Sequence, residues 1–524
     1  MKKTFFDKIK LCKKYTAFAY IVMMTAVLPL YMEDGFRMIG DAKYRFFWYV
    51  SIFFVALGGV LVAASWLLDT ERKKEKRNDI NGRKSVALSY PELFALFFIV
   101  TTILSTFFSA YTKTALYGFD DWHMGLYTQF FLMTGFFIAS RWGGCNRYAL
   151  IPAWVSAVLI CHLTMINRCG DDPLGVYHGM DWFDWNRRNL LATIGNINWV
   201  CCYLAVAVPI LCFCYWKARG YLRILAFIGA FSGMAAMMLQ GSAAGFADIA
   251  VMLGILLFVS IEDREKLIRF LDTATLIPLF WSIFSLFQID LITPDDANVK
   301  QYYSIMWLIP LAILVGFDAF LRLRGKKHKP DLLAKPELRK KLRAILIALP
   351  IAGMLLLIAC QFSESLWMRF GGIGLLRIDD NWGSFRGSLW RIALRCFSEL
   401  KPANMIYGIG PDCFVYAYEK LGVHIAATGQ WENVTYANAH NEMLTMLVNE
   451  GALGLLTYLG IFVSSLKAMI HKYHQNPMAL MGILVVAGYL SNGLFAFQQA
   501  VSSPFIFAVM GLIVGNCTEE SSIR

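Results

Sequence analysis

Long apolar stretches separated by short polar breaks occupy most of this chain, and they predict membrane-spanning helices. A helix needs roughly 17 to 25 mainly apolar residues to cross the hydrocarbon core of a bilayer. Dividing the sequence at its polar breaks gives fourteen apolar stretches, at residues 16–31, 46–68, 89–109, 125–140, 148–166, 197–216, 224–240, 246–261, 270–289, 305–321, 344–362, 445–466, 479–498 and 502–516. Strands of a closed barrel alternate polar and apolar residues, and these stretches do not. We therefore expect an all-α polytopic membrane protein with about fourteen transmembrane helices.

The composition agrees with this class. Apolar residues make up 57% of the 524 positions, aromatic residues make up 15%, and the mean hydropathy is +0.51. A soluble domain of this size has a smaller apolar share.

The apolar pattern also divides the chain into parts. We expect an N-terminal segment 1–15, a bundle of about eleven helices 16–362 with an outer loop 167–198 and a basic linker 322–343, a large loop 363–440, the last helices 441–516, and a tail 517–524. The large loop is the longest interruption of the apolar pattern. Chemistry that needs water and polar side chains is therefore most strongly expected there.

The lysines and arginines predict the orientation of the chain. If the N-terminus is cytoplasmic, 34 of the 49 lysines and arginines fall on the cytoplasmic side. The positive-inside rule then places both termini inside the cell and the loop 363–440 outside the cytoplasmic membrane. The net charge of +12 reflects this bias and an attraction to anionic membrane lipids. Nucleic acid is not an expected partner, because the basic runs are scattered between the spans.

The sequence gives no sign of a metal or nucleotide cofactor. Its twelve cysteines have no metal-ligand spacing with histidine, and no Walker-type glycine-rich loop is present. Cys396 and Cys413 both fall in the large loop, and the sequence leaves open whether they form a disulfide. We expect no cofactor.

The outer loop before the stretch 197–216 carries two adjacent arginines. Arg187 and Arg188 lie just outside a span, on the side that should avoid positive charge, so they require a counter-anion. Trp182 and Trp185 in the same loop suit either sugar stacking or an interfacial tryptophan belt, and both interpretations remain open.

Arginine dominates the large loop. The planar guanidinium binds phosphate in a bidentate way, whereas lysine offers a point charge. The loop has only two lysines, and its arginines are Arg369, Arg377, Arg386, Arg391 and Arg395. Arg391 and Arg395 share one face of a predicted helix, and Arg386 precedes that helix. We expect one of these three to bind substrate and the others to pair with Asp379, Asp380 or lipid phosphate.

The segment that follows the large loop begins with His440 and Asn441. The N-terminus of a helix carries a positive partial charge, which favours a neutral imidazole that can accept a proton. An inert polar cap is the alternative interpretation of His440. The arginine-rich loop beside it favours a catalytic base. Gly451, Gly454 and Gly460 predict a smooth helix face for close packing.

These patterns resemble the bacterial O-antigen ligases and the related Wzy-type polymerases of O-antigen, capsule and exopolysaccharide. Four stretches carry the resemblance, which covers about residues 90 to 515: Arg188 to Tyr203 with its Gly-Asn-x-Asn, Gln240-Gly241-Ser242, Arg386-x-x-x-Trp390 through Gly408-Ile-Gly-Pro411, and His440-Asn441 followed after nine residues by Gly451-x-x-Gly454. The last is the most specific, because it fixes the distance between His-Asn and two glycines.

The chain also departs from the family pattern. Ala243 stands where the family often has arginine, and Leu455 replaces the threonine that follows the second glycine in ligases. Ligase and polymerase therefore both remain open. Either Arg187 or Arg188 can be the counterpart of the family's first arginine. The family usually has twelve spans, and the additional pair of this chain can lie at 270–289 and 305–321.

The resemblance implies a GT-C-like glycosyltransferase in the inner membrane of a bacterium. Its donor would be a glycan on undecaprenyl diphosphate, and its acceptor a hydroxyl of a glycan or lipid outside the cytoplasmic membrane. Arg188 and Arg386 would neutralise the departing diphosphate, and His440 would be the base of an inverting, metal-independent reaction. The positions expected to bind substrate are Arg187, Asn196, Asn198, Trp390, Arg391 and Asn441. A transporter or flippase of an anionic lipid-linked glycan is the alternative function.

Overall fold

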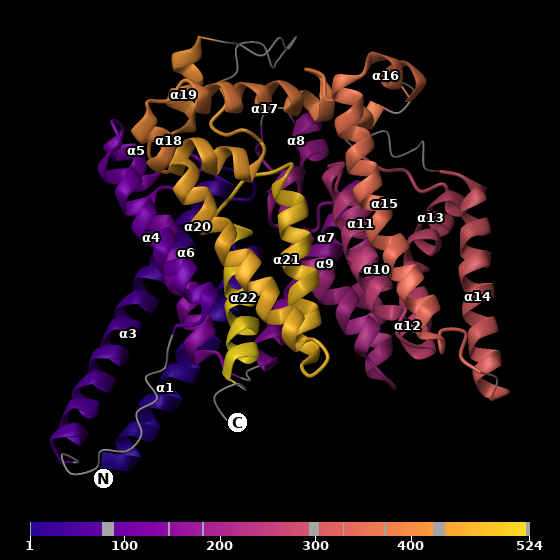
Figure 1. Ribbon diagram of the computed structural model, residues 1–524, viewed down its shortest axis with the longest axis horizontal. Coiled ribbons are helices and arrows are strands. Elements are labelled where there is room, and N and C mark those ends of the chain that lie inside the picture. Colours follow the sequence, from indigo (N-terminus) through magenta and orange to yellow (C-terminus); the bar gives the residue numbers. More distant parts are fainter. Residues whose placement is uncertain are drawn as a thin grey trace.

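The computed structural model describes residues 2–75, 88–144, 147–180, 183–292, 303–328, 330–370, 374–422 and 435–519. Helices account for most of these residues (Figure 1). The described residues contain one small antiparallel sheet, formed by β1 (Leu190–Leu191) and β2 (Gly195–Asn196).

The helices follow one another with short connections. The first half of the chain forms α1 (Lys2–Val22), η1 (Met23–Val27), α2 (Leu28–Leu30), α3 (Ile39–Glu75), α4 (Tyr90–Phe107), α5 (Thr112–Tyr117), α6 (Leu126–Trp142), η2 (Arg147–Ala149), α7 (Leu150–Arg168), α8 (Phe183–Asn189), α9 (Ile197–Lys217), α10 (Leu222–Leu239) and α11 (Ala244–Ser260). The second half forms α12 (Arg264–Ala274), α13 (Leu276–Phe287), η4 (Ile305–Trp307), α14 (Leu308–Lys326), α15 (Pro336–Phe362), α16 (Glu364–Phe370), η5 (Gly374–Leu376), α17 (Trp382–Ser398), α18 (Pro402–Tyr407), α19 (Phe414–Leu421), α20 (Glu442–Lys472), α21 (Pro477–Gly493) and α22 (Ser503–Glu519).

All fourteen apolar stretches coincide with helices. Ten helical segments of the described chain are long and apolar enough to cross a membrane, with consecutive helices such as α12 and α13 counted together. Three more, α11, α21 and α22, are apolar but shorter, and α6 has 17 residues. The expectation of an all-α protein with many apolar helices is confirmed, and the count of fourteen spans stays a prediction.

Some predicted boundaries differ from the structure. The N-terminal segment expected at 1–15 is helical from Lys2 onward, as the start of α1. The linker expected at 322–343 is also largely helical, because α14 runs to Lys326 and α15 begins at Pro336. Proline is favoured in the first turn of a helix, where its missing N–H costs no hydrogen bond. The basic residues of this segment therefore mark helix ends and not an extended linker.

The bundle has two ends with different contents (Figure 1). Short helices α5, α8 and α16 to α19 gather at one end, which we call the α17 end. Helix α1 begins and helix α22 ends at the other, which we call the opposite end. The described parts of loops 167–198 and 363–440 thus share one end of the molecule. That this end faces the outside of the cytoplasmic membrane stays a prediction.

Helix α9 forms the centre of the bundle, whereas α14 and α15 lie at its edge. Every residue of α9 from Val200 to Phe213 is buried. A helix that is apolar on all sides is stable only where other helices cover it. By contrast, α14 buries only Leu321 and α15 only Cys360.

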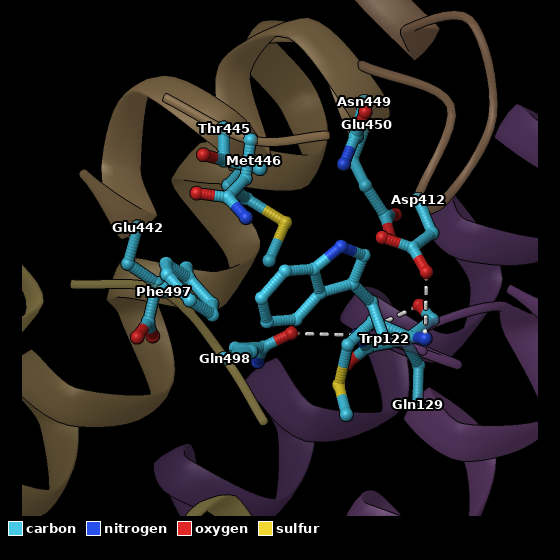
Figure 2. Close-up of a pocket in the computed structure, with 12 residues that line it drawn as sticks. Trp122, Gln129, Asp412, Glu442, Thr445, Met446, Asn449, Glu450, Phe497 and Gln498 are labelled. Atoms are coloured by element: carbon cyan, nitrogen blue, oxygen red, sulfur yellow. Dashed lines mark hydrogen bonds between the residues drawn. The ribbon is translucent and has the colours of Figure 1, made fainter. Parts of the chain in front are cut away.

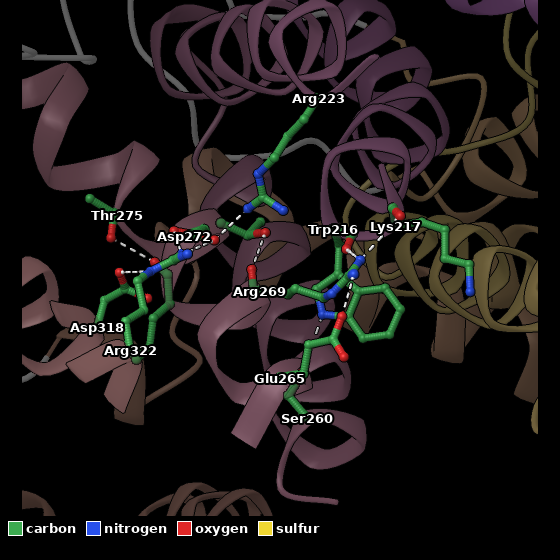
Figure 3. A network of polar contacts seen from close by, with 12 residues as sticks. Trp216, Lys217, Arg223, Ser260, Glu265, Arg269, Asp272, Thr275, Asp318 and Arg322 are labelled. Carbon is green, nitrogen blue, oxygen red and sulfur yellow. Dashed lines mark hydrogen bonds and ion pairs between the residues drawn. The ribbon is translucent and has the colours of Figure 1, made fainter. Parts of the chain in front are cut away.

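At the opposite end, ion pairs join α10, α12 and α14 (Figure 3). The carboxylate of Asp272 pairs with Arg223 and with Arg322, and its oxygens lie 2.9 Å from Nη2 of Arg322. Nε of Arg322 donates to Asp318 over 2.6 Å. Three helices are therefore connected by alternating positive and negative side chains.

A second contact at this end holds the C-terminus of α9 (Figure 3). Nη1 of the buried Arg269 donates to the carbonyl oxygens of Trp216 and Lys217 at 2.7 and 3.1 Å. Its Nη2 lies 2.8 Å from the carboxylate of Glu265. Because the last carbonyls of a helix have no partner within the helix, an arginine there both satisfies them and favours the helix dipole.

Helix α20 is interrupted at Gly451, where φ is +71°. A Cβ at this position would overlap the carbonyl oxygen of Ile406, so glycine allows the segment before Gly410 to approach the helix. The carbonyl oxygen of Asn449 accepts from N of Gly410 over 2.9 Å and from Oγ of Ser105 over 2.9 Å. Gly451 thus allows the predicted close packing, here against α18, but it also breaks α20 and is not part of a continuous helix face.

The prediction of close packing holds for Gly460. A Cβ there would overlap the ring of Phe94 in α4. Helix α4 therefore packs directly against the backbone of α20, as small residues at a helix interface allow.

Candidate active site

A sharp change of direction at the start of α17 positions Arg386. The residues Gly383, Ser384 and Phe385 have φ values of 60°, 58° and 67°, and the regular helix resumes at Arg386. Nε of Arg386 donates to the carbonyl oxygen of Phe495 over 2.9 Å, and Nη1 donates to that of Gly383 over 2.6 Å. Arg386 thus connects α17 to the segment that follows α21.

Trp390 lies one turn further along α17 and packs inward. Its ring centroid is 5.3 Å from that of Trp382 and 6.3 Å from that of Phe495. The indole Nε1 is buried, and within the described part of the chain it has no hydrogen-bond partner. The predicted role of Trp390 in substrate binding stays a prediction.

The other two arginines of α17 lie on its exposed face. Arg391 pairs with Asp380, and Arg395 pairs with Glu399 at 2.9 Å. All four side chains are more than half exposed. One of Arg386, Arg391 and Arg395 is predicted to bind substrate. Of these three, Arg386 is the one directed toward the bundle.

His440 lies immediately before the cap of α20. Its φ is +46°, a left-handed conformation that few residues other than glycine, asparagine, aspartate and histidine adopt. The ring lies edge-on to Phe497, with centroids 5.1 Å apart, and 6.3 Å from the ring of Tyr436. Burial, and to a lesser extent the positive charge of Arg386, lower the pKa of His440 to about 3. The imidazole is therefore neutral at physiological pH.

Asn441, and not His440, caps α20. Oδ1 of Asn441 accepts from N of Leu444 over 3.0 Å, and its Nδ2 donates to the carbonyl oxygen of Leu494 over 3.1 Å. Both polar groups of this side chain are used to hold the backbone around His440. The interpretation of His440 as a helix cap is not supported, because its neighbour has that role.

Asn196 has the corresponding role at the start of α9. Its Oδ1 accepts from N of Asn198 over 2.9 Å, which caps the helix. The predicted substrate contacts of Asn196 and Asn198 stay predictions. Trp185 of the same loop is exposed, and Trp182 lies outside the described residues.

A buried arginine that the sequence analysis did not single out organises the region of Arg188. The guanidinium of Arg168 donates to four carbonyl oxygens, those of Leu239, Gln240, Arg188 and Ile292, at 2.7, 2.6, 2.8 and 2.9 Å. Arg168 is completely buried. An arginine at the end of an apolar stretch is a signal for such a role, because ionisable residues in membrane helices are costly unless paired.

Arg187 and Arg188 both lie on α8. Nη2 of Arg187 donates to the carbonyl oxygen of Gly170. The main chain of Arg188 is tied through Arg168 to Gln240. The structure thus joins two of the stretches that carry the family resemblance, although Arg188 and Gln240 are far apart in the sequence.

The other stretches meet at the same end. Gly410 bonds to Asn449 just before the break in α20, and Arg386 and His440 both contact the segment after α21, through the carbonyl oxygen of Phe495 and the ring of Phe497. The structure therefore brings Arg386 and His440 together.

A small cavity lies beside Phe497 and is lined by carboxylates (Figure 2). Its volume is about 30 Å³, which is room for a water molecule. Trp122 reaches into it, and the carboxylates of Asp412, Glu442 and Glu450 surround it. Phe497 also contacts His440, so the cavity adjoins the predicted base.

Each of these carboxylates is held by uncharged donors. Oδ2 of Asp412 accepts from N of Phe119 and N of Met124, both at 2.8 Å, and burial raises the pKa of Asp412 to about 6. Glu450 accepts from Oγ1 of Thr102 over 2.7 Å.

Glu442 accepts from the hydroxyl groups of Tyr458 and Tyr489. Sequence reasoning missed Glu442 and Asp412 as neighbours of the site. Asp412 directly follows the Gly-Ile-Gly-Pro stretch, and Glu442 follows His440 by two positions.

Few side chains in this region are grouped so that they could coordinate a metal ion. The described residues contain no group of three or more histidine, cysteine, aspartate or glutamate side chains that could hold a metal ion. The metal independence of the reaction stays a prediction. Cys396 and Cys413 are both buried, and each is a free thiol in the structure.

The described residues form a helical membrane protein whose candidate active site, with His440 and Arg386, lies at one end of the helix bundle. No protein-family model matches the chain, and comparison with curated proteins finds no match. The resemblance to O-antigen ligases and polymerases therefore rests on the four sequence stretches alone.

Proposed function

We propose that this protein is a membrane glycosyltransferase with a GT-C-like architecture. It transfers or polymerises a glycan from an undecaprenyl-diphosphate donor onto an acceptor hydroxyl. The reaction takes place at the α17 end, which faces the outside of the bacterial inner membrane.

The observation that carries this proposal is that Arg386 and His440 both contact the segment after α21: Nε of Arg386 donates to the carbonyl oxygen of Phe495 over 2.9 Å, and the ring of His440 lies 5.1 Å from that of Phe497. A guanidinium is a permanent cation and cannot act as a base, whereas a neutral imidazole can. Arg386 acts on His440 strongly enough to contribute to its lowered pKa. One group suited to an anionic leaving group therefore lies next to one suited to deprotonating a nucleophile.

In the proposed step, the acceptor oxygen forms a bond to the anomeric carbon while the bond from that carbon to the diphosphate oxygen breaks. His440 takes the hydroxyl proton, and the diphosphate leaves with the bonding electron pair. Arg386 and Arg188 neutralise the developing charge, which is the form of electrostatic stabilisation that contributes most in many enzymes. A bound diphosphate raises the pKa of His440, because a nearby negative charge favours the imidazolium.

The alternative is a transporter or flippase of an anionic lipid-linked glycan. Transporters of this kind place ionisable groups near the middle of the membrane. Among the described residues, the most deeply buried charged groups lie near helix ends or a helix break: Lys43 and Asp248 are the fifth residues of α3 and α11, Arg168 is the last of α7, and Glu450 directly precedes the break in α20. This distribution favours chemistry at one end of the bundle over passage through its centre.

The test is glycan transfer by purified protein in lipid nanodiscs, with a lipid-diphosphate glycan as donor. We expect His440→Asn to lower the rate by about 10²- to 10⁴-fold, the usual contribution of a positioned base. Asparagine tolerates the left-handed conformation at this position, so the variant should fold. His178→Asn is the matched control, because His178 is an exposed histidine of the loop 167–198. Transfer by His440→Asn at half the normal rate or more would remove the catalytic assignment.

A further inference from the structure

A groove of about 480 Å³ opens at the α17 end between the first turns of α3, helix α5 and helix α19. This volume lies within the range of small-molecule sites. Aromatic and polar side chains alternate along its walls, among them Tyr44, Trp48, Tyr49, Lys113, Asp120 and Tyr416. The groove is separate from the small cavity beside Phe497.

Contacts behind the groove hold its walls in place. The ring of Tyr44 stacks on His123 with centroids 4.2 Å apart, and Nε2 of His123 lies 2.8 Å from Oδ1 of Asp41. On the other wall, the hydroxyl of Tyr416 lies 2.8 Å from Oγ1 of Thr114. Because these side chains are fixed, the groove is formed before a ligand arrives.

The loop of residues 118–124 forms one side of the groove and is itself held firmly. Gly118 has a φ of +92°, and a Cβ there would overlap the backbone of His123, so the loop closes tightly on itself. The buried carboxylate of Asp412 accepts hydrogen bonds from N of Phe119 and N of Met124. The loop is thus anchored to the segment that follows Gly408-Ile-Gly-Pro411.

The same loop reaches the candidate active site. Asp120 and His123 line the groove, whereas Trp122 points to the other side of the loop. The ring of Trp122 lies 4.7 Å from that of Phe497 (Figure 2). The ring of Phe497 in turn lies 5.1 Å from that of His440. A series of ring contacts therefore connects the wall of the groove to the base, with Arg386 beyond it.

We propose that this groove binds the saccharide portion of the acceptor, an inference that rests on the proposed function. A transferase that joins two substrates needs a place for each, and Arg386 and Arg188 serve the donor. The faces of tyrosine and tryptophan cover the C–H faces of sugar rings, while Tyr hydroxyls, Lys113, Arg45 and Asp120 offer partners for sugar hydroxyls. The competing occupant is a phospholipid headgroup, since tyrosine and tryptophan also gather at membrane interfaces.

The first experiment identifies the occupant without any turnover. The photoreactive residue p-benzoylphenylalanine replaces Tyr49, which is 67% exposed, and the protein is irradiated in its native host membrane. Mass spectrometry then determines what is attached. We expect adducts that contain sugar. The same residue in place of Tyr90, 74% exposed at the opposite end of the bundle, is the control and should yield only phospholipid adducts. Phospholipid adducts alone at both positions would overturn the proposal.

The second experiment measures two-substrate kinetics with acceptor glycolipid purified from the same membrane. We expect Lys113→Ala and Tyr49→Ala to raise the KM for the acceptor by about tenfold, which corresponds to one well-formed contact, and to leave the KM for the donor unchanged. Both side chains are exposed, so the fold should be unaffected. Lys401→Ala is the matched control, because Lys401 is an exposed lysine of the same end outside the groove.

An unchanged acceptor KM in both variants would overturn the groove as the acceptor site. Wild-type protein that transfers no glycan would instead overturn the proposed function. The adducts formed at position 49 decide the occupant of the groove in either case.

Discussion

The two ends of the bundle handle buried charge in different ways. At the opposite end, the partly buried Asp272 lies between Arg223 and Arg322, and the buried Arg269 pairs with Glu265 while it donates to two backbone carbonyl oxygens. At the α17 end, the hydrogen bonds of Arg168 and Lys43 go to backbone carbonyl oxygens. The carboxylates there are held by hydroxyl groups and backbone N–H groups.

This difference distinguishes contacts that only hold helices together from an arrangement that can bind a charged substrate. Paired side chains at the opposite end hold helices together and present little net charge. At the α17 end, Arg168 and Arg386 donate to backbone carbonyl oxygens, hold loops in position and keep their charge. The α17 end therefore retains an electrostatic field that a charged substrate can meet, in surroundings where little water weakens it.

The largest effect on stability should come from Arg168→Met, which leaves four carbonyl oxygens without their donor. We expect a loss of about 3 kcal/mol or more in the free energy of unfolding, because each buried unsatisfied group costs about 1 to 3 kcal/mol. Denaturant titration in detergent measures it. Arg219→Met is the control at the opposite end, where the pair with Glu265 is exposed and should contribute less than about 1 kcal/mol. Equal losses in the two variants would contradict the contrast between the ends.

The next largest effect should come from Arg386→Lys, which keeps the charge and removes the planar fork. We expect the transfer rate to fall by about 10²-fold, as when one electrostatic donor to a transition state is lost. Arg395→Lys on the same helix should retain normal transfer, because Arg395 is exposed and paired with Glu399. Gel analysis of products from equal amounts of folded protein measures both. Near-normal product from Arg386→Lys would rule out bidentate phosphate binding by this residue.

A smaller effect is expected at the opposite end. A double-mutant cycle with Arg223→Met and Asp272→Asn should give a coupling energy of about 1 kcal/mol, typical of neighbouring partners in one network. Both single variants should transfer glycan at the normal rate. A loss of transfer without a loss of stability would show that this end takes part in the reaction.

Stability should also depend on pH. The pKa of His440 is about 3 in the folded protein against an ordinary value of 6.5, so the folded chain binds fewer protons than the unfolded chain between these values. The contribution of His440 to stability is therefore complete above pH 6.5 and decreases as the pH falls toward 3. Acidification should lower the melting temperature of the wild type more than that of His440→Asn, as scanning fluorimetry can measure.

Asp412 should show the opposite sign. Burial raises its pKa to about 6 from 3.8, so the folded chain binds more protons than the unfolded chain between these values. Its contribution is complete below pH 3.8 and is lost as the pH rises through 6. Acidification should therefore stabilise the wild type relative to Asp412→Asn. The same direction of change for both variants would show that one of the two environments is described wrongly.

The helices could be predicted from the sequence because apolar length is a local property. The stretch 197–216 is apolar along its whole length, and it became the buried helix α9. The linker at 322–343 was predicted less well, because its many lysines and arginines indicate solvent while α14 and α15 continue into it. Charged residues with long side chains are compatible with helix, and only the partners across the bundle decide where the helix ends.

The site could be predicted in part. Arg386 and His440 were identified because arginine and histidine in a large loop are chemically unusual, and the structure brings them together. Arg168 was missed because its partners Gln240 and Ile292 are 72 and 124 residues away. Asn441 was expected to bind substrate, but its amide groups hold Leu444 and Leu494. Such assignments depend on three-dimensional contacts that no local pattern contains.

The break in α20 at Gly451 bears on how the chain matures in the membrane. A broken helix exposes backbone groups that hydrocarbon cannot satisfy, so it is stable in a bilayer only with protein partners. The partners of Asn449 are Ser105 in α4 and the backbone of residues 409–410. All of them are synthesised before α20. The last long helix of the described chain therefore enters a membrane where its hydrogen-bond partners already exist, and deletion of residues 409–410 would remove two of the donors that stabilise the break in α20.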